Sequence, residues 1–279
     1  MISININITF IEKNKILLYN ISQYGICISF INTEDVMTNI YDDVVEVARR
    51  TMVLFFLVDT SGSMEGAKIG TLNQAIEDVI PEIRDISQNN ADAEIKIAVL
   101  EFSSGAKWVT PYPVPAEDFE WQYLNAVGLT DFGEACRELD EKLSRNTFMS
   151  DITGSFAPAV FLLSDGAQTD EYKENLNKLW NNNWFKKAIK VAVAIGEDAN
   201  KNILAEFTGN IEGVLSVHNP EALKKMIKFV SVTSSQIGSR SSAVGKGGID
   251  EIKSKQDEFL EQVNVAYSNG DFEDEYIEW

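Results

Sequence analysis

Three oxygen-bearing side chains follow an apolar run at a spacing that suits a metal ion. Asp59, Ser61 and Ser63 come directly after the run 53–58, and Gly62 between the two serines permits a tight turn. Carboxylate and hydroxyl oxygens are hard donors of the kind that Mg²⁺ prefers. This stretch alone therefore predicts a weak cation site with one negative charge.

Two further segments supply oxygen donors. Asp165 follows the apolar run 160–163, and Thr130 lies in a Gly-Leu-Thr loop before a segment with helical periodicity. If both apolar runs are strands of one parallel sheet, their carboxyl ends meet at the same edge. The candidate site for Mg²⁺ then consists of Asp59, Ser61, Ser63, Thr130 and Asp165, and its two carboxylates balance the charge of the ion.

The elements that must position these residues alternate between strands and helices. Apolar runs at 53–58, 95–100, 160–163 and 188–195 are typical of strands buried on both faces of a sheet. Segments with helical periodicity lie at 67–87, 132–144, 170–181, 199–207 and 221–231. This order predicts an α/β fold, with a doubly wound, mostly parallel central sheet flanked by helices on both faces.

Together, the motifs in residues 51–233 resemble the metal-ion-dependent adhesion site of von Willebrand factor A domains. The resemblance rests on Asp-Thr-Ser-Gly-Ser after an apolar strand, Gly-Leu-Thr before a helix, and Ser-Asp-Gly after a later strand. It implies the Rossmann-like fold of that family, a Mg²⁺ or Mn²⁺ held by the five residues named above, and a protein partner that supplies an acidic side chain to the metal. Leu129 departs from the pattern, because the bacterial group of this family described in the next paragraph tends to have a second small residue at this position.

The stretches 59–64, 72–75, 163–170 and 229–235 are similar to the intracellular bacterial group associated with tellurium resistance, TerY. This similarity implies a cytoplasmic, non-enzymatic adaptor or scaffold in a stress-response system. Two alternatives share the site: a metal-dependent phosphoesterase using Asp59 and Asp165, and an extracellular adhesin of the same fold, for which no export signal or anchor is visible. The single histidine, His218, is interpreted as a loop residue, so no catalytic triad is assembled from it.

Composition narrows the classes of partner. Lys and Arg number 24 and Asp and Glu 43, which gives a net charge of −19 at pH 7 and disfavours nucleic acid and anionic membrane surfaces. No run reaches the roughly 18 apolar residues of a membrane span. Trp180 and Trp184 lie among lysines and are interpreted as packing residues, not as a nucleic-acid platform. Cys27 and Cys136 are interpreted as free thiols in a reducing compartment.

The ends of the chain differ from this regular pattern. Residues 1–50 are predicted to be an N-terminal extension, either with a hairpin in 1–36 or as an upstream segment that the functional protein lacks. Residues 51–233 form the predicted domain. Residues 234–279 are predicted to contain a Ser/Gly-rich linker at 234–248, a short amphipathic helix with Phe259 and Val263 on one side, and a solvated acidic tail.

Overall fold

The computed structural model describes residues 6–12, 15–22, 25–32, 49–152, 154–168, 170–196, 199–217, 220–239 and 254–271. The chain divides into two units, Met1–Ala48 and Arg49–Trp279. In the first unit, β1 (Ile6–Glu12), β2 (Lys15–Ser22) and β3 (Gly25–Asn32) form an antiparallel sheet in the order β1-β2-β3. The predicted hairpin is therefore a three-stranded sheet, because the segment 15–22, whose apolar residues do not alternate strictly, pairs with both neighbours.

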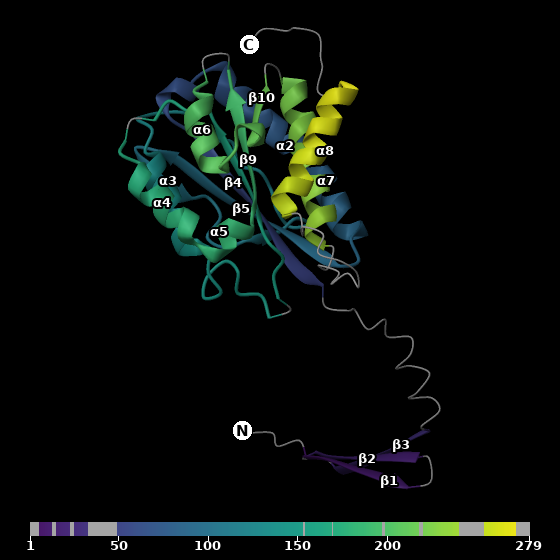
Figure 1. Ribbon diagram of the computed structural model, residues 1–279. Coiled ribbons are helices and arrows are strands. Elements are labelled where there is room, and N and C mark those ends of the chain that lie inside the picture. The colour runs from purple at the N-terminus through teal and green to yellow at the C-terminus, as the bar shows by residue number, and fades with distance from the viewer. Residues whose placement is uncertain are drawn as a thin grey trace. The chain divides into compact units, whose positions relative to one another are not determined.

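The described part of the second unit contains a seven-stranded mixed sheet. Its parallel strands are β4 (Arg50–Asp59), β5 (Ala93–Ser103), β8 (Ala159–Ser164), β9 (Ile189–Ile195) and β10 (Val214–Val217). Two short strands, β6 (Gly105–Trp108) and β7 (Val114–Pro115), pair antiparallel with β5. The order β10-β9-β8-β4-β5-β6 places β4 inside the sheet and confirms the predicted doubly wound, mostly parallel architecture (Figure 1).

Helices cover both faces of this sheet (Figure 1). One face carries α2 (Ala67–Asn89), α7 (Pro220–Ser239) and α8 (Lys255–Asn269). The other carries α3 (Phe132–Lys142), α4 (Lys173–Asn181), α5 (Asn183–Lys187) and α6 (Lys201–Thr208). Two 3₁₀ turns, Gly62–Met64 and Ile211–Gly213, complete the helical segments that the structure describes. Within the described ranges, no helix has the length and apolar character needed to cross a membrane.

The side chains of β4 explain why both faces of the sheet need covering. Met52, Leu54 and Phe56 point into the core beneath α2 and α7, whereas Val53 and Phe55 point into the core beneath α3 and α4. All five are fully buried. A parallel strand that is apolar on both sides is stable only between two layers of helices. The uninterrupted apolar run in the sequence is the signal of this interior position.

The Ser-rich stretch that was predicted to be a linker begins inside α7, which continues to Ser239. Ser234 is fully buried and Ile237 is almost so, which means that tertiary packing overrides the weak helix propensity of serine. The predicted amphipathic helix is α8, which buries Phe259 and Val263. Residues 240–253 and the tail from 272 onward lie outside the described residues, as do His218 and the side chain of Cys27.

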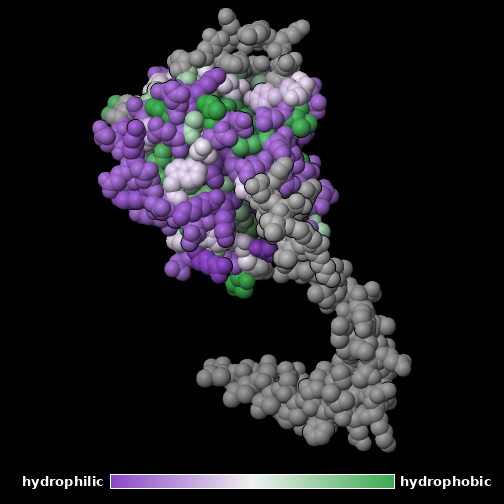
Figure 2. Space-filling view, in the orientation of Figure 1, coloured by the Kyte–Doolittle hydropathy of each residue, from purple (hydrophilic) through white to green (hydrophobic). Residues whose placement is uncertain are grey.

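The surface of the described second unit is largely hydrophilic in the view of Figure 2, with scattered apolar residues. This agrees with the high content of acidic residues in the sequence. Cys136 is a free cysteine, and its thiol is fully buried between α3 and the sheet. Burial raises the pKa of this thiol well above its usual value, so it is not a reactive group.

Candidate metal centre

The predicted site residues gather where the sheet reverses its winding. β4 and β8 are parallel neighbours, but the chain leaves β4 toward β5 on one side and leaves β8 toward β9 on the other. Such a switch point opens a crevice at the carboxyl ends of the strands, where α/β proteins hold ligands. Asp59 is the last residue of β4 and Asp165 directly follows β8, with relative exposures of 0% and 3%. The fold therefore brings the two predicted carboxylates to one buried place.

The loop after β4 arranges the first three candidate ligands. The Ser61 backbone N–H donates to Asp59 Oδ1 at 2.9 Å, and the Ser61 and Ser63 hydroxyl oxygens lie 3.0 Å apart. Neighbouring ligands of an octahedral ion with metal–oxygen distances of 2.0–2.1 Å are also about 3 Å apart. Ser61 is 1% exposed whereas Ser63 is exposed, so the site runs from a buried base to an open rim.

The loop that carries Thr130 is held against this first loop. The Val127 backbone N–H donates to the Thr60 carbonyl at 2.7 Å, and that of Gly62 donates to the Gly128 carbonyl at 2.9 Å. A Cβ added to Gly62 would lie 3.2 Å from the Gly128 oxygen, so this close approach favours glycine. Thr130 is 2% exposed. The structure thus places the third predicted segment beside the other two.

Thr130 lies directly before the N-cap residue of α3. Thr130 is not the N-cap of this helix, because Asp131 occupies the N-cap position and its side chain accepts from the Glu134 backbone N–H. The Asp170 carboxylate accepts hydrogen bonds from the first two helical N–H groups, at 3.1 and 2.7 Å. Asp170 therefore ties the segment after Asp165 to the Thr130 loop, a role that sequence reasoning missed.

The electrostatic environment of Asp59 favours binding of a cation. Burial raises the pKa of this carboxyl, hydrogen bonds from Ser164 and Ser61 oppose the rise, and the negative charge of Asp165 adds to it. The Ser164 hydroxyl donates to Asp59 Oδ2 at 2.6 Å. Two carboxylates buried at the same end of the sheet repel each other unless positive charge lies between them. The donor set of carboxylate and hydroxyl oxygens fits a small divalent ion.

The second carboxylate already has a cationic neighbour. Lys68 Nζ lies 3.0 Å from Asp165 Oδ2, and the Ala167 backbone N–H donates to Asp165 Oδ1 at 3.1 Å. Lys68 stands in the first turn of α2, where the helix dipole disfavours a cation. Sequence reasoning missed this residue, although a lysine at a helix start was the available signal.

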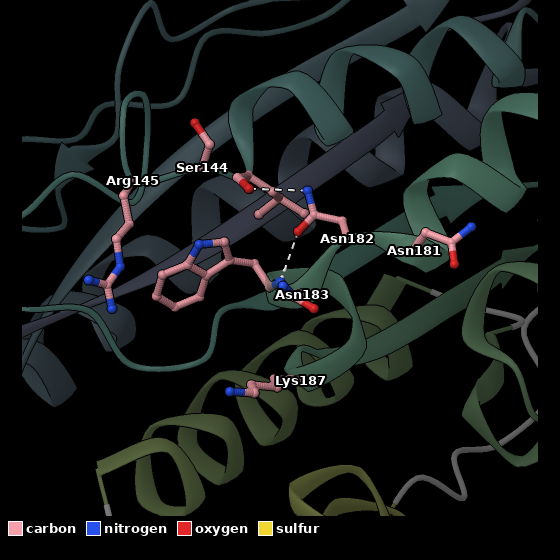
Figure 3. Close-up of a pocket in the computed structure, with 8 residues that line it drawn as sticks. Ser144, Arg145, Asn181, Asn182, Asn183 and Lys187 are labelled. Carbon is pink, nitrogen blue, oxygen red and sulfur yellow. Dashed lines mark hydrogen bonds between the residues drawn. The ribbon is translucent and has the colours of Figure 1, made fainter.

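Within the described ranges, no group of three or more His, Cys, Asp or Glu side chains could hold a metal ion, so the candidate site consists of two carboxylates and hydroxyl donors. A separate hollow of about 540 Å³ lies between the end of α3 and α5, and none of the five predicted ligands lines it. Figure 3 shows its lining residues. Within it, Asn182 Nδ2 donates to the Leu143 carbonyl at 3.1 Å, and Asn182 Oδ1 accepts from the Trp184 backbone N–H at 2.8 Å. These contacts join the end of α3 to α5.

The two tryptophans near this hollow pack against the core. The Trp180 ring lies edge-on to Phe185 with centroids 5.2 Å apart, and its Nε1 donates to the Glu206 carbonyl at 3.1 Å. Trp184 is partly buried against the same core. The packing interpretation of these residues agrees with the structure.

The fold is similar to solved structures of low sequence identity. Proximal thread matrix protein 1 from the mussel byssus aligns at TM-score 0.50 and 16% identity, over 66% of this chain and 48% of its own. The pilus adhesin SpaC from Lactobacillus rhamnosus GG aligns at TM-score 0.52 and 10% identity, over 82% of this chain and 33% of its own. A von Willebrand factor type A structure from Catenulispora acidiphila aligns at TM-score 0.48 and 15% identity, over 79% and 45%.

At these identities the likeness shows the fold alone. The chain spans about half the length of the mussel and Catenulispora proteins that it matches. The mussel protein has also been solved with zinc in its MIDAS motif, the metal-ion-dependent adhesion site. The sequence matches no protein-family model and no curated protein.

Proposed function

We propose that this protein is a metal-dependent protein-interaction module. The observation that carries the proposal is the pair of buried carboxylates, Asp59 and Asp165, at the switch point of the sheet, beside two hydroxyl oxygens 3.0 Å apart. One Mg²⁺ or Mn²⁺ is held by Asp59, Ser61, Ser63, Thr130 and Asp165. The resemblance of these motifs to the von Willebrand factor A site supports the same assignment.

The partner supplies a Glu or Asp side chain to the metal. Two carboxylates only balance a divalent ion, so the ion still attracts an anionic oxygen at a remaining coordination position. Long-range attraction does not explain this binding, because a chain of net charge −19 repels acidic proteins on average. The rim beside Thr130 carries Val127 and Leu129, which are 70% and 64% exposed. An acidic residue flanked by apolar groups therefore suits this surface.

The proposed activity is binding and not catalysis. Both oxygens of Asp59 accept hydrogen bonds, and both oxygens of Asp165 have polar neighbours. Besides a metal that activates water, a phosphoesterase commonly uses a group positioned to take a proton from the attacking water. The remaining proposed ligands are serine and threonine hydroxyls, which are poor bases. These features favour the interaction module over the phosphoesterase alternative.

The finer proposal is a cytoplasmic adaptor in a bacterial stress-response system of the tellurium-resistance type. Its support is the similarity of short sequence stretches, together with Cys136 as a free thiol. The extracellular alternative draws only on the fold that the chain shares with SpaC, a pilus adhesin. Fractionation of the source cells, with the protein detected by antibody, separates the two. Recovery outside the cell would overturn the cytoplasmic assignment.

Calorimetry with Mn²⁺ tests the metal site. Asp165→Ala is expected to weaken Mn²⁺ binding by at least about tenfold, because it removes half of the neutralising charge. Asp118→Ala, a change at an exposed carboxylate outside the site, is the matched control and is expected to leave the affinity unchanged. Equal Mn²⁺ affinity in the wild-type protein and Asp165→Ala would overturn the site. A partner that is captured equally well with and without EDTA would overturn metal-dependent recognition.

A further inference from the structure

The ammonium group of Lys68 forms an ion pair with Asp165, one of the proposed metal ligands. Its Nζ lies 3.0 Å from Asp165 Oδ2, with side-chain exposures of 18% for Lys68 and 3% for Asp165. An ion pair this well buried is screened little by solvent, so its charges act strongly on any further ion that enters the crevice. The position of Lys68 therefore affects the affinity of the site for a metal ion.

The place of Lys68 in its helix gives an independent reason to assign it a role. It is the second residue of α2, whose first turn contains no acidic residue and whose N-cap, Gly66, makes no side-chain cap. A lysine at this position is destabilising, because its positive charge is repelled by the partial positive charge at the start of the helix. The contact with Asp165 compensates for this local cost.

We propose that Lys68 is a tethered cation that occupies Asp165 in the metal-free protein and competes with the divalent ion for it. The inference rests on the metal site proposed above and adds a control on its affinity. Without metal, Lys68 neutralises one of the two buried carboxylates. When the ion binds, its charge and the ammonium repel each other, so the ammonium must withdraw from Asp165 or share it at a cost in affinity.

A charge count shows a second consequence. Asp59, Asp165 and Lys68 sum to −1 without metal and to +1 with a divalent ion. Because Lys68 stays attached to α2 beside the crevice, the loaded site carries a net positive charge. This excess favours the carboxylate of an acidic partner over water at the open coordination position.

The experiment compares Mn²⁺ binding by calorimetry in the full chain and three variants. Lys68→Met removes the competing cation and is expected to bind Mn²⁺ about tenfold more tightly or better. Lys68→Arg keeps a cation and is expected to stay within about threefold of the wild-type protein. Lys201→Met is the matched control: Lys201 is exposed and follows Asn200, whose backbone N–H donates to the Asp165 carbonyl at 2.8 Å. It removes the same charge near the site without breaking a described contact to the carboxylate.

Thermal unfolding supplies a second readout. In EDTA, Lys68→Met is expected to melt below the wild-type protein, because Asp165 loses its ion pair. Saturating Mn²⁺ is expected to raise the melting temperature of Lys68→Met by more than that of the wild-type protein. If Lys68→Met does not fold, Lys68→Gln, which can still donate a hydrogen bond without a charge, carries the same expectations.

The results distinguish a wrong metal site from a wrong role of Lys68. If the folded wild-type protein and the Lys68 variants all fail to bind Mn²⁺, the proposed metal site is wrong. If the wild-type protein binds Mn²⁺ and Lys68→Met binds it equally or less tightly, the site stands and the competition is wrong. A gain in Lys201→Met equal to that in Lys68→Met would also overturn it, because general charge would then explain the effect.

Discussion

Two buried charged residues of this protein are accommodated in different ways. Asp59 accepts hydrogen bonds from Ser61 and Ser164 and faces a second carboxylate. Lys190, in β9, is 2% exposed, and its Nζ donates to the carbonyls of Phe185 and Ala188 at 3.1 and 2.8 Å. Neutral carbonyls satisfy the hydrogen bonds of an ammonium but do not cancel its charge. Only the environment of Asp59 therefore favours an additional cation.

The charge of Lys190 predicts a pH dependence of stability. Burial lowers the pKa of Lys190 from 10.5 to about 8 in the folded protein. Between those pH values the unfolded chain holds a proton on Lys190 that the folded chain has lost, so raising the pH stabilises the fold. Relative to Lys190→Met, the wild-type protein is expected to gain up to about 3 kcal/mol of unfolding free energy across this range. Below pH 8 both states are protonated and this slope vanishes.

Urea unfolding at pH 7, 8, 9 and 10 measures this difference. Lys187→Met, at an exposed lysine just before β9, is the control and is expected to follow the wild-type curve. Parallel curves for the wild-type protein and Lys190→Met would show that Lys190 titrates normally.

The positions of the candidate carboxylates at the strand ends could be predicted from the sequence, whereas their supporting contacts could not. Asp59 and Asp165 each follow an uninterrupted apolar run, and that pattern fixes them at strand ends of a parallel sheet. Lys68 at a helix start and Ser164 in the Ser-Asp-Gly motif are visible in the sequence, but neither position shows which carboxylate the side chain contacts. Their roles depend on the distance between segments about 100 positions apart in the sequence, which only the folded chain defines.

At the scale of elements, the strands were easier to predict than the ends of the helices. The strands of the sheet interior combine continuous apolar runs with flanking loops, and each predicted run lies within or overlaps an observed strand. The short edge strands β6 and β7 were missed, since Gly105–Trp108 and Val114–Pro115 bury little and are fixed only by pairing with β5. The end of α7 was missed because serine is a weak helix former that buried packing tolerates here.

The C-terminal helix α8 is part of the core of its unit. Its Gln256 side chain accepts from the Lys190 backbone N–H at 2.8 Å and donates to the Lys190 carbonyl at 3.1 Å, as a neighbouring strand would. The Phe259 ring is fully buried, with its centroid 6.3 Å from that of Phe229 in α7. Figure 1 shows α8 lying along α7. The helix therefore covers part of the sheet edge and is not an appendage.

This arrangement predicts a large effect of a core substitution in α8. Phe259→Ala is expected to lower the unfolding free energy by about 3–5 kcal/mol, because it leaves a cavity against α7. Val265→Ala, at a position 60% exposed on the same helix, is the control and is expected to change it by less than about 1 kcal/mol. Urea denaturation with two spectroscopic probes measures both values. Equal, small effects of the two substitutions would mean that α8 is not packed as described.

At the scale of the whole molecule, net charge and local charge act in opposite directions on an acidic partner. The chain carries −19 at pH 7, whereas the proposed loaded site, counted with Lys68, carries +1. Salt screens the long-range repulsion over about 8–10 Å but affects the direct metal contact much less. The combination favours a partner that presents one acidic residue at close range over one with a broadly acidic surface.

The two units of the chain differ in what they contribute to the site. All five proposed ligands lie in the unit Arg49–Trp279. In its sheet, β4 is paired on both sides, with β5 and with β8, and the first three strands form a sheet of their own. The interior of the seven-stranded sheet therefore has no position that an N-terminal strand must fill.

A chain that begins at Met37 is consequently expected to fold and to bind metal. It keeps every described contact of the second unit, including the carboxylate pair and Lys68. Its melting temperature is expected to lie within about 2 °C of that of the full chain, which corresponds to less than 1 kcal/mol. Its Mn²⁺ affinity by calorimetry is expected to be unchanged. If the shortened chain were insoluble, or melted without cooperativity, the N-terminal strands would contribute to the stability of the second unit, and the division of the chain into two independent units would be wrong.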